Sequence, residues 1–332
     1  MSITQPPAAT PALPDRSSLL MFFGVFQILL GCISGLMALM MVAVGVLGPM
    51  ARGPQGQAVD ARMMIPAMAF YLVLAVVLVW LGVGSIRARR WAWTLTVVLS
   101  WMWLIVGVMS FVVFVFAAGP MMSASIAQQQ PKMPPAAIVI MQVVMGAVMA
   151  CIYILLPGLF LVFYQRESVR ATCWRRDPQV RWTDRCPMPV LAVCILHGSS
   201  ALCMPLSAAY YGFVMPAFGH ILSGAAGAAV MLPLTLVMAY LAWGTYRLKM
   251  AAWWGTLLLW MVGIVNMGTV SQTLLLEMYE KMRMPAAQLA MIRRSGMIEM
   301  MALWMPWLGI VCGGAWLGYL LVIRRYFVRD RG

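Results

Sequence analysis

Eight long apolar stretches constrain the fold of this chain more than any other feature. They are Leu19–Pro49, Ile65–Ile86, Trp91–Ala118, Ala136–Tyr164, Pro189–Val214, Ile221–Tyr246, Ala251–Leu276 and Met297–Ile323. A hydrocarbon core about 30 Å thick needs about 20 helical residues, and each stretch is long enough. Lipid offers the backbone no water, and these stretches lack the alternating pattern of barrel strands. The sequence therefore predicts an all-α integral membrane protein with eight transmembrane helices.

Composition excludes the other broad classes of protein. Only 10% of the 332 residues are charged and 63% are hydrophobic, whereas a soluble domain carries about 25% charged residues. The apolar content is also far too high for a disordered chain. The net charge of +14 suggests nucleic acid at first sight. However, the basic residues lie in short runs between the apolar stretches, where membrane orientation and lipid contact explain them, so we expect no nucleic-acid partner.

The basic residues also predict the orientation of the chain. Taking the loops in turn puts sixteen Lys and Arg residues on one side of the membrane and seven on the other. The sixteen are Arg16, Arg87, Arg89, Arg90, Arg166, Arg170, Arg175, Arg176, Arg181, Arg185, Arg247, Lys249, Arg324, Arg325, Arg329 and Arg331; the seven are Arg52, Arg62, Lys132, Lys281, Arg283, Arg293 and Arg294. Cytoplasmic loops are enriched in these residues, so we expect both termini in the cytoplasm.

The second half of the sequence repeats features of the first. The segment 84–93 (GSIRARRWAW) aligns with 244–253 (GTYRLKMAAW) at an offset of 160, and the preceding leucines and valines keep that register. Two outward segments, 132–136 (KMPPA) and 283–287 (RMPAA), also match. Four spans in each half is an even number, so both halves insert the same way. This pattern predicts two tandem, parallel four-helix units.

The predicted domain order follows from this repeat. We expect a disordered cytoplasmic tail at 1–18, a first membrane unit at 19–165 and a basic cytoplasmic linker at 166–187. The second unit covers 188–325 and a short tail covers 326–332. The linker holds Trp174 and Trp182 among its arginines, which favours docking on anionic headgroups, while a solvated connector is the alternative.

The turn motif G-[ST]-x-R-x-[RK] at Gly84–Arg89 and Gly244–Lys249 is a point of resemblance. Together with the Pro-rich tail and the outward Met/Pro/Gln segment, it resembles four-span modules in uncharacterised bacterial inner-membrane proteins. The resemblance implies a bacterial inner-membrane location and no specific activity. The second half departs from the motif's flank, because Met250 and Ala251 replace Arg90 and Trp91.

Basic and small residues supply the first candidate sites. Contacts with anionic headgroups are expected from Arg87, Arg89, Arg90, Arg247, Lys249, Arg175 and Arg176. We expect Gly84 to permit a tight reversal in the turn and nearby Trp residues to anchor the next helix. Close helix packing is expected from Gly31, Gly35, Gly309, Gly313, Gly314 and Gly318, with homodimerisation as the alternative for these G-x-x-x-G patterns.

Polar residues inside the apolar stretches form the second candidate site. They are His197, Gln27, Asn266 and Gln142. Intramembrane ionisable residues are often functional because burial without a partner is costly. A gapless alignment of the first spans pairs Gln27 with His197, which favours a neutral, hydrogen-bonded histidine over a proton relay.

Cofactor and catalytic signals are absent from the sequence. Seven cysteines show no metal-site spacing, and His220 is predicted at the outer end of a helix, away from His197. Methionines near the outer surface, including Met63, Met64, Met121, Met122, Met133, Met282 and Met284, raise Cu(I) binding as an alternative to simple apolar packing. No phosphate loop, H-E-x-x-H or nucleophile elbow is present. We therefore expect neither cofactor nor catalysis.

The sequence thus favours a multi-pass protein with a structural or interaction role. Its expected partners are the lipid bilayer with anionic headgroups and another membrane protein or a second copy of itself. A small-solute permease using the duplicated units is the alternative, supported by the repeat and by His197. Transporters usually break helices at the midplane of both repeats, and Pro157 and Pro306 lie at different places in their spans.

Overall fold

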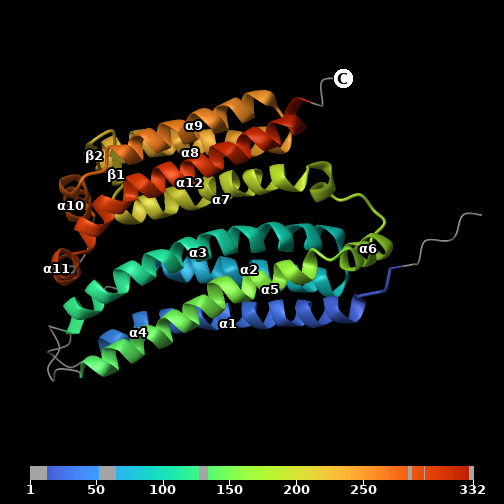
Figure 1. Ribbon diagram of the computed structural model, residues 1–332, viewed down its shortest axis with the longest axis horizontal. Coiled ribbons are helices and arrows are strands. Elements are labelled where there is room, and N and C mark those ends of the chain that lie inside the picture. The colour runs from blue at the N-terminus through green and yellow to red at the C-terminus, as the bar shows by residue number, and fades with distance from the viewer. Residues whose placement is uncertain (1–12, 52–64, 127–133, 283–285, 295, 329–332) are drawn as a thin grey trace, which may run out of the picture. The chain divides into compact units, whose positions relative to one another are not determined.

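The computed structural model describes residues 13–51, 65–126, 134–282, 286–294 and 296–328, and helices dominate it (Figure 1). In chain order the elements are α1 (Ser17–Ala51), α2 (Ile65–Ile86), α3 (Arg90–Ile126), α4 (Pro135–Ala150), the π-helical turn η2 (Cys151–Leu155), α5 (Leu156–Tyr164), α6 (Glu167–Arg176), the 3₁₀ turn η3 (Trp182–Arg185), α7 (Met188–Tyr211), β1 (Met215–Ala217), β2 (His220–Leu222), α8 (Gly224–Tyr246), α9 (Met250–Gly268), α10 (Gln272–Lys281), α11 (Ala286–Arg294) and α12 (Met297–Val328).

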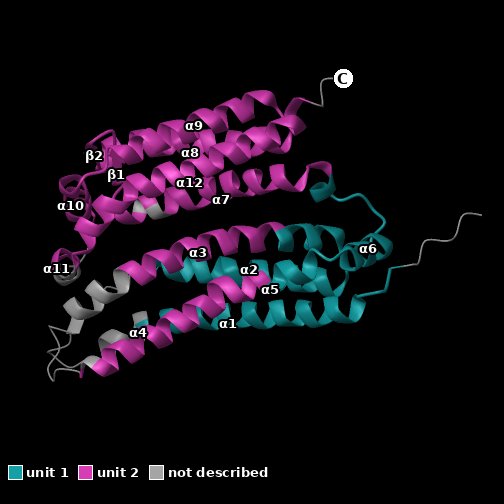
Figure 2. Ribbon diagram, viewed as in Figure 1, with its two compact units in different colours: residues 1–97, 159–184 teal, residues 98–158, 185–332 magenta. Residues whose placement is uncertain are grey.

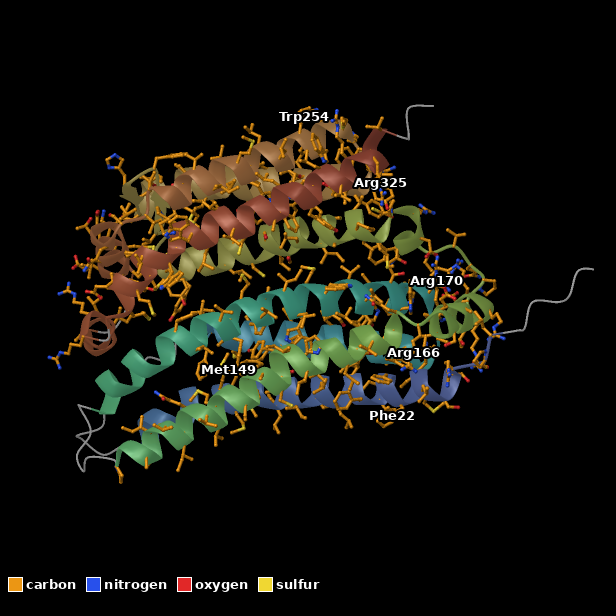
Figure 3. The ribbon with its side chains drawn as sticks, viewed as in Figure 1. Phe22, Met149, Arg166, Arg170, Trp254 and Arg325 are labelled. Carbon is orange, nitrogen blue, oxygen red and sulfur yellow. The ribbon has the colours of Figure 1, made fainter. Side chains whose placement is uncertain are left out.

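Eight helices in the described residues are long and apolar enough to cross a membrane, which confirms the predicted number of spans. They cover Ser17–Val44, Ile65–Ile86, Arg90–Phe116, Ala136–Tyr164, Met188–Leu206, Gly224–Tyr246, Met250–Gly268 and Met297–Val328. Large apolar side chains remain exposed along them. Phe22 is 65% exposed and Trp254 is 54% exposed, and both point away from their helices (Figure 3). Such surfaces suit lipid, and the protein is a multi-pass helical membrane protein.

Three predicted stretches extend beyond their helices: Pro189–Val214, whose helix ends at Tyr211, and two others. The stretch predicted as Ile221–Tyr246 begins in a β-hairpin, and its helix starts only at Gly224. In the antiparallel β1–β2 pair Pro216 lies opposite Ile221, and Phe218 and Gly219 both have positive φ in the turn. His220 therefore lies in a strand, not at the end of a helix. The stretch predicted as Ala251–Leu276 ends its helix at Gly268, after which Ser271 caps the amphipathic helix α10.

The fourth span contains a π-helical turn ahead of Pro157. Proline has no N–H, so the carbonyl of Tyr153 loses the donor that an α-helix would supply. Instead, the N–H of Leu156 donates to the carbonyl of Cys151, five residues earlier. A Cβ on Gly107 of α3 would collide with the Tyr153 carbonyl, so glycine there allows α3 to approach this turn.

The chain forms two compact units (Figure 2). Unit 1 comprises residues 1–97 and 159–184, and unit 2 comprises residues 98–158 and 185–332. The division differs from the predicted boundaries, because residues 98–158 group with the second half of the chain. Within unit 2, Met109 Sδ lies 3.3 Å from Cys312 Sγ, and the Phe116 and Trp304 rings stack at 5.7 Å. Side-chain contacts between α3 and α12 thus bridge the sequence halves.

Two turns with the same hydrogen bonds join α2 to α3 and α8 to α9. In the first, Ala88 N–H donates to Ser85 and Arg89 N–H to Gly84; in the second, the equivalent donors are Leu248 and Lys249. The residues with positive φ are Ala88 (49°) and Leu248 (53°). The expectation that Gly84 makes the reversal is therefore wrong. A Cβ on Gly84 would lie 2.5 Å from the Cβ of Ala92, and one on Gly244 would lie 2.7 Å from the Cβ of Ala252. These glycines therefore permit close helix packing instead.

Candidate functional site

A chain of buried hydrogen bonds lies in unit 1 around Gln27, which is 2% exposed. Its Nε2 donates to Thr96 Oγ1 (3.3 Å) and its Oε1 accepts from the Ser85 hydroxyl (3.1 Å). The Tyr164 hydroxyl in turn donates to Ser85 Oγ (2.8 Å), and the Trp93 indole donates to the Tyr164 carbonyl (2.7 Å). This chain joins α1, α2, α3 and α5. An unpaired amide in an apolar interior is costly, so these partners fix how the four helices meet.

His197 of α7, which the sequence alignment pairs with Gln27, lies in unit 2 and is 1% exposed. Its Nε2 lies 3.2 Å from Thr256 Oγ1 on α9, and its Nδ1 lies 3.2 Å from Met238 Sδ on α8. Because a thioether sulfur can only accept, the Met238 contact requires the proton on Nδ1. In the neutral ring, Nε2 then accepts from the Thr256 hydroxyl. These contacts join three helices, and neither ring nitrogen faces a charged group.

The other two polar candidates have separate surroundings. Asn266 at the end of α9 accepts from the Phe218 N–H (2.7 Å) and donates to the Pro216 carbonyl (3.1 Å). It therefore fastens the β-hairpin, where Phe218 adopts a positive φ of 48°. Gln142 is half-buried on α4. Asn266 therefore shares none of its hydrogen-bond partners with His197 in unit 2.

Ser85, Thr96 and Thr256, which make these contacts, are not among the predicted site residues. The offset of 160 pairs Ser85 with Thr245, Trp93 with Trp253, and Thr96 with Thr256. In unit 2 the Trp253 indole donates to the Leu320 carbonyl (2.8 Å), as Trp93 does to Tyr164. Polar residues repeated at one offset were a signal that would have found them.

A second polar cluster lies at the α2–α3 turn of unit 1, around Asp177, which is 1% exposed. Its carboxylate accepts from the Arg90 N–H at the start of α3 (3.2 Å), from Arg181 Nη2 (2.7 Å) and from Arg89 Nη1 (3.4 Å). The hydrogen bond from Arg181, followed by that of the Arg90 N–H and the charges of Arg181 and Arg89, lowers the pKa of Asp177 despite its burial. Asp177 thereby attaches the linker to the N-terminus of α3, which carries the positive end of the helix dipole.

Aromatic rings complete this cluster. The Arg90 guanidinium lies 4.3 Å from the centre of the Trp174 ring, and that of Arg170 lies 5.7 Å from the Trp93 ring. Arg166 and Arg170 mark the α5–α6 end in Figure 3. The linker thus contains the helix α6 and the turn η3, and specific contacts hold it within unit 1. Its contact with anionic headgroups stays a prediction.

The cations predicted to bind headgroups fall into two groups. In unit 1, Arg89 and Arg90 are engaged by Asp177 and Asp184, and Arg176 pairs with Asp15 at 3.0 Å. Arg175 donates to the Leu13 carbonyl (3.1 Å), so residues 13–16 of the predicted tail are attached to α6, and residues 1–12 lie outside the described residues. Other headgroup candidates, Arg87, Arg247 and Lys249, are exposed, and the described residues place no acid within ion-pair distance of them.

The predicted packing glycines also divide. A Cβ on Gly31 would lie 2.8 Å from Val79 on α2, and one on Gly313 would lie 2.4 Å from Ile264 on α9. Gly35 and Gly309 likewise face neighbouring helices, at 3.7 and 3.0 Å. Gly314 and Gly318 meet no atom within 4 Å. Gly31, Gly309 and Gly313 therefore permit close packing, whereas a Cβ at Gly35 would make an ordinary contact and one at Gly314 or Gly318 would have open space among the described residues.

The described residues contain no group of three or more His, Cys, Asp or Glu side chains that could hold a metal ion. Of the methionines considered for copper, Met63, Met64, Met133 and Met284 lie outside the described residues, as do the side chains of Met121 and Met122. Met282 packs against a small apolar cluster that includes Leu274. Comparison of the chain with protein-family models, curated proteins and solved structures finds no match.

The Asp177 contacts generate a prediction about acid stability. Asp177→Asn keeps an acceptor for the Arg90 N–H but removes the charge that Arg181 and Arg89 bind, so we expect a loss of about 2 kcal/mol at neutral pH. A carboxyl with a lowered folded-state pKa contributes stability above its ordinary value, 3.8, and loses it as the pH falls through the folded-state pKa. Thermal unfolding in detergent from pH 7 to pH 3 measures both effects. Equal stability of wild type and variant at pH 7 would contradict this account of Asp177.

Proposed function

We propose that this protein is a structural or interaction component of a bacterial inner membrane, without catalysis, built from two copies of one four-helix unit. The observation that carries the proposal is that the deepest polar side chains serve helix packing. Gln27 and His197 bind equivalent threonines, Thr96 and Thr256, at 3.3 and 3.2 Å. Groups committed to neighbouring helices are poorly placed to bind a solute or transfer a proton.

Further corresponding contacts support the duplication. Both indoles at the α3 and α9 starts donate to a carbonyl of the last span in their half, and both turns use the same hydrogen bonds. Each half also has a close approach between its third and fourth spans. The glycine that permits it lies on the third span in the first half and on the fourth span in the second half. Gly107 faces Tyr153 in one half, and Gly309 faces Met267, the partner of residue 107 at offset 160, in the other. Duplication of a four-helix segment followed by divergence accounts for a glycine that lies on different helices in the two halves.

A permease is the second candidate, and a specific observation favours it. In unit 1 the Ser85 hydroxyl contacts both Gln27 and Tyr164. At the equivalent place in unit 2, Leu320 has no hydroxyl, and the buried Oγ1 of Thr245 has no hydrogen-bond partner. The buried indole nitrogens of Trp260 and Trp316 are also unpartnered, with their rings 5.1 Å apart. These groups are available to a polar solute or to water.

The two candidates predict different behaviour of His197→Gln. Glutamine has the same groups as Gln27, so we expect its amide N–H₂ to donate to Thr256 as that of Gln27 donates to Thr96. One hydrogen bond of this kind contributes about 1 kcal/mol to the free energy of unfolding. We therefore expect the melting temperature of His197→Gln to lie within a few degrees of wild type. His197→Leu, the matched control, leaves Thr256 without this partner and should be less stable. Thermal unfolding of the two purified variants measures this.

Flux assays on the same variants complete the test. Glutamine cannot titrate, so a proton-coupled permease that used His197 would lose flux in reconstituted vesicles while remaining folded. A stable His197→Gln variant with abolished proton-coupled flux would refute the structural role and favour the permease.

We further propose that both termini face the cytoplasm, because an even number of spans puts them on one side and the basic bias favours that side. The natural thiols of the linker are poor reporters of orientation. Burial, and secondarily the charge of Asp177, raises the pKa of Cys173 to about 12, and burial raises that of Cys186 to about 12.

Exposed positions can report orientation instead. In a background without the seven native cysteines, Val180→Cys uses a linker position that is 70% exposed, and His220→Cys uses an exposed position in the hairpin. A membrane-impermeant thiol reagent added to spheroplasts should label position 220 and spare position 180 until the cells are lysed. The reverse pattern would invert the proposed orientation.

A further inference from the structure

The turn ends of the two units differ in how their cations are neutralised. In unit 1, Asp15, Asp177 and Asp184 pair with Arg176, Arg181, Arg89 and Arg90. In unit 2 the corresponding cations are Arg247 and Lys249 in the α8–α9 turn and Arg324 and Arg325 at the end of α12. All four are exposed, and none has an acidic partner among the described residues. Among the described residues, this end of unit 2 therefore carries cations without acidic partners.

The start of α9 lacks the carboxylate that its counterpart has. At the start of α3, Asp177 accepts from the Arg90 N–H (3.2 Å) and lies 3.4 Å from Arg89. Lys249 occupies the position of Arg89 in the α8–α9 turn, but no side chain caps the start of α9. The first N–H groups of a helix have no partner within the helix and attract anions. The same backbone arrangement thus holds an anion in unit 1 and is open in unit 2.

Two cations near the start of α9 stack on aromatic rings. The Arg324 guanidinium lies 5.4 Å from the centre of the Trp253 ring in the first turn of α9, much as Arg170 lies 5.7 Å from Trp93. Lys249 Nζ lies 3.9 Å from the centre of the Trp243 ring. Stacking on aromatic faces holds each charge in place while leaving donors free, because neither cation is spent in an ion pair.

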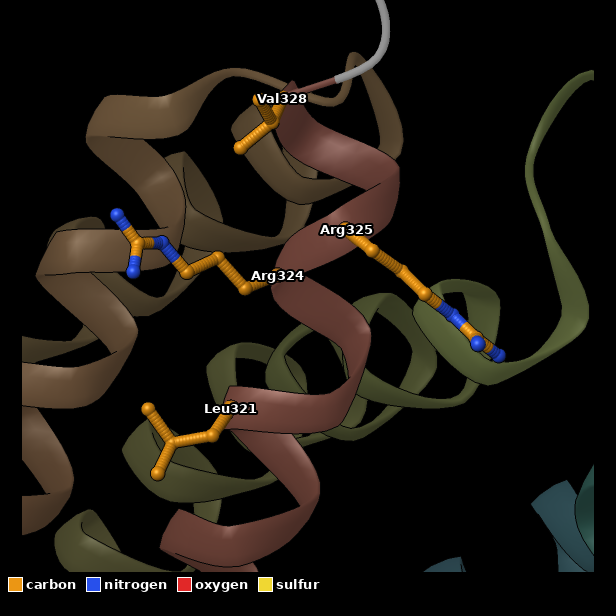
Figure 4. A pocket seen from close by; sticks show the side chains of 4 residues that line it. All are labelled: Leu321, Arg324, Arg325 and Val328. Carbon is orange, nitrogen blue, oxygen red and sulfur yellow. The ribbon is translucent and has the colours of Figure 1, made fainter.

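Apolar side chains adjoin the charges. Leu321, Arg324, Arg325 and Val328 line a shallow groove along the last turns of α12 (Figure 4). Arg324 extends from α12 in the direction opposite to Arg325, and Leu321 and Val328 are 58% and 53% exposed. These residues belong to the last membrane span, so an anion bound here would have a hydrocarbon-compatible surface beside it.

We propose that Lys249, Arg324 and the open start of α9 bind the phosphate of an anionic phospholipid, in the place that Asp177 takes in unit 1. A lipid satisfies both chemistries: its phosphate meets the cations and N–H groups, and its acyl chains cover Leu321. A free phosphate would use only the cations and N–H groups and would leave Leu321 uncovered. The inference does not depend on the structural role proposed above, since either candidate function could include a bound lipid.

Native mass spectrometry of the full chain in neutral detergent tests the inference, with phosphatidylglycerol and phosphatidylcholine as probes. We expect the wild type to retain phosphatidylglycerol preferentially. Removal of one surface cation weakens headgroup binding about fivefold, so Lys249→Gln with Arg324→Gln should weaken it about 25-fold. Arg293→Gln is the control, because it removes one cation from an exposed pair with Glu280 near the other end of α12.

A second variant supplies the missing carboxylate. Ala251→Asp puts an acid in the first turn of α9, where a negative charge suits the helix, so the protein should fold while losing phosphatidylglycerol retention. The proposal would be overturned if the double variant and Ala251→Asp both retained as much phosphatidylglycerol as Arg293→Gln. It would also be overturned if the wild type bound phosphatidylcholine as well as phosphatidylglycerol. Displacement of the lipid by millimolar inorganic phosphate would also overturn it, because the site would then select the anion without its acyl chains.

Discussion

A polar side chain inside a hydrocarbon layer has no water to bond, and the two units meet this constraint in corresponding ways. Gln27 and His197 stand on the first span of their halves, and each reaches a threonine on the third. The alternative to these contacts is an unsatisfied polar group in an apolar medium. They therefore limit the registers in which α1 and α7 can pack, and the glycine-mediated approaches of neighbouring helices follow from those registers.

The sequence predicts the spans well because hydrophobic length is a local property. It predicts their ends less well, since hairpin residues such as Ile221 are as apolar as the helix that follows. The turn chemistry was misassigned for a physical reason. The motif predicts that Gly84 permits the tight reversal, but the residue with positive φ is Ala88, and Gly84 is needed for helix approach. Local composition alone does not separate these two uses of glycine.

The candidate sites could be predicted only in part. His197 and Gln27 are visible because a polar residue in an apolar run is conspicuous. The role of Asp177 is not visible, because its partner Arg90 lies 87 residues away and the linker reads simply as basic. Arg90 was accordingly expected at a headgroup, whereas the structure stacks it on Trp174. Long-range neutralisation of charge decides which cations stay available, and only the folded arrangement reveals it.

Proximity of matched cysteine pairs tests most directly the claim that one set of contacts is used twice. In a background without native cysteines, one matched pair has cysteines at positions 27 and 96, in place of Gln27 and Thr96. The other has cysteines at positions 197 and 256, in place of His197 and Thr256. The controls move the second cysteine one turn along, to Ser100 or Trp260. With a short bifunctional thiol reagent in native membranes, we expect both matched pairs to cross-link and both controls to react poorly. Cross-linking of only one matched pair, or equal reaction of the controls, would contradict the shared register.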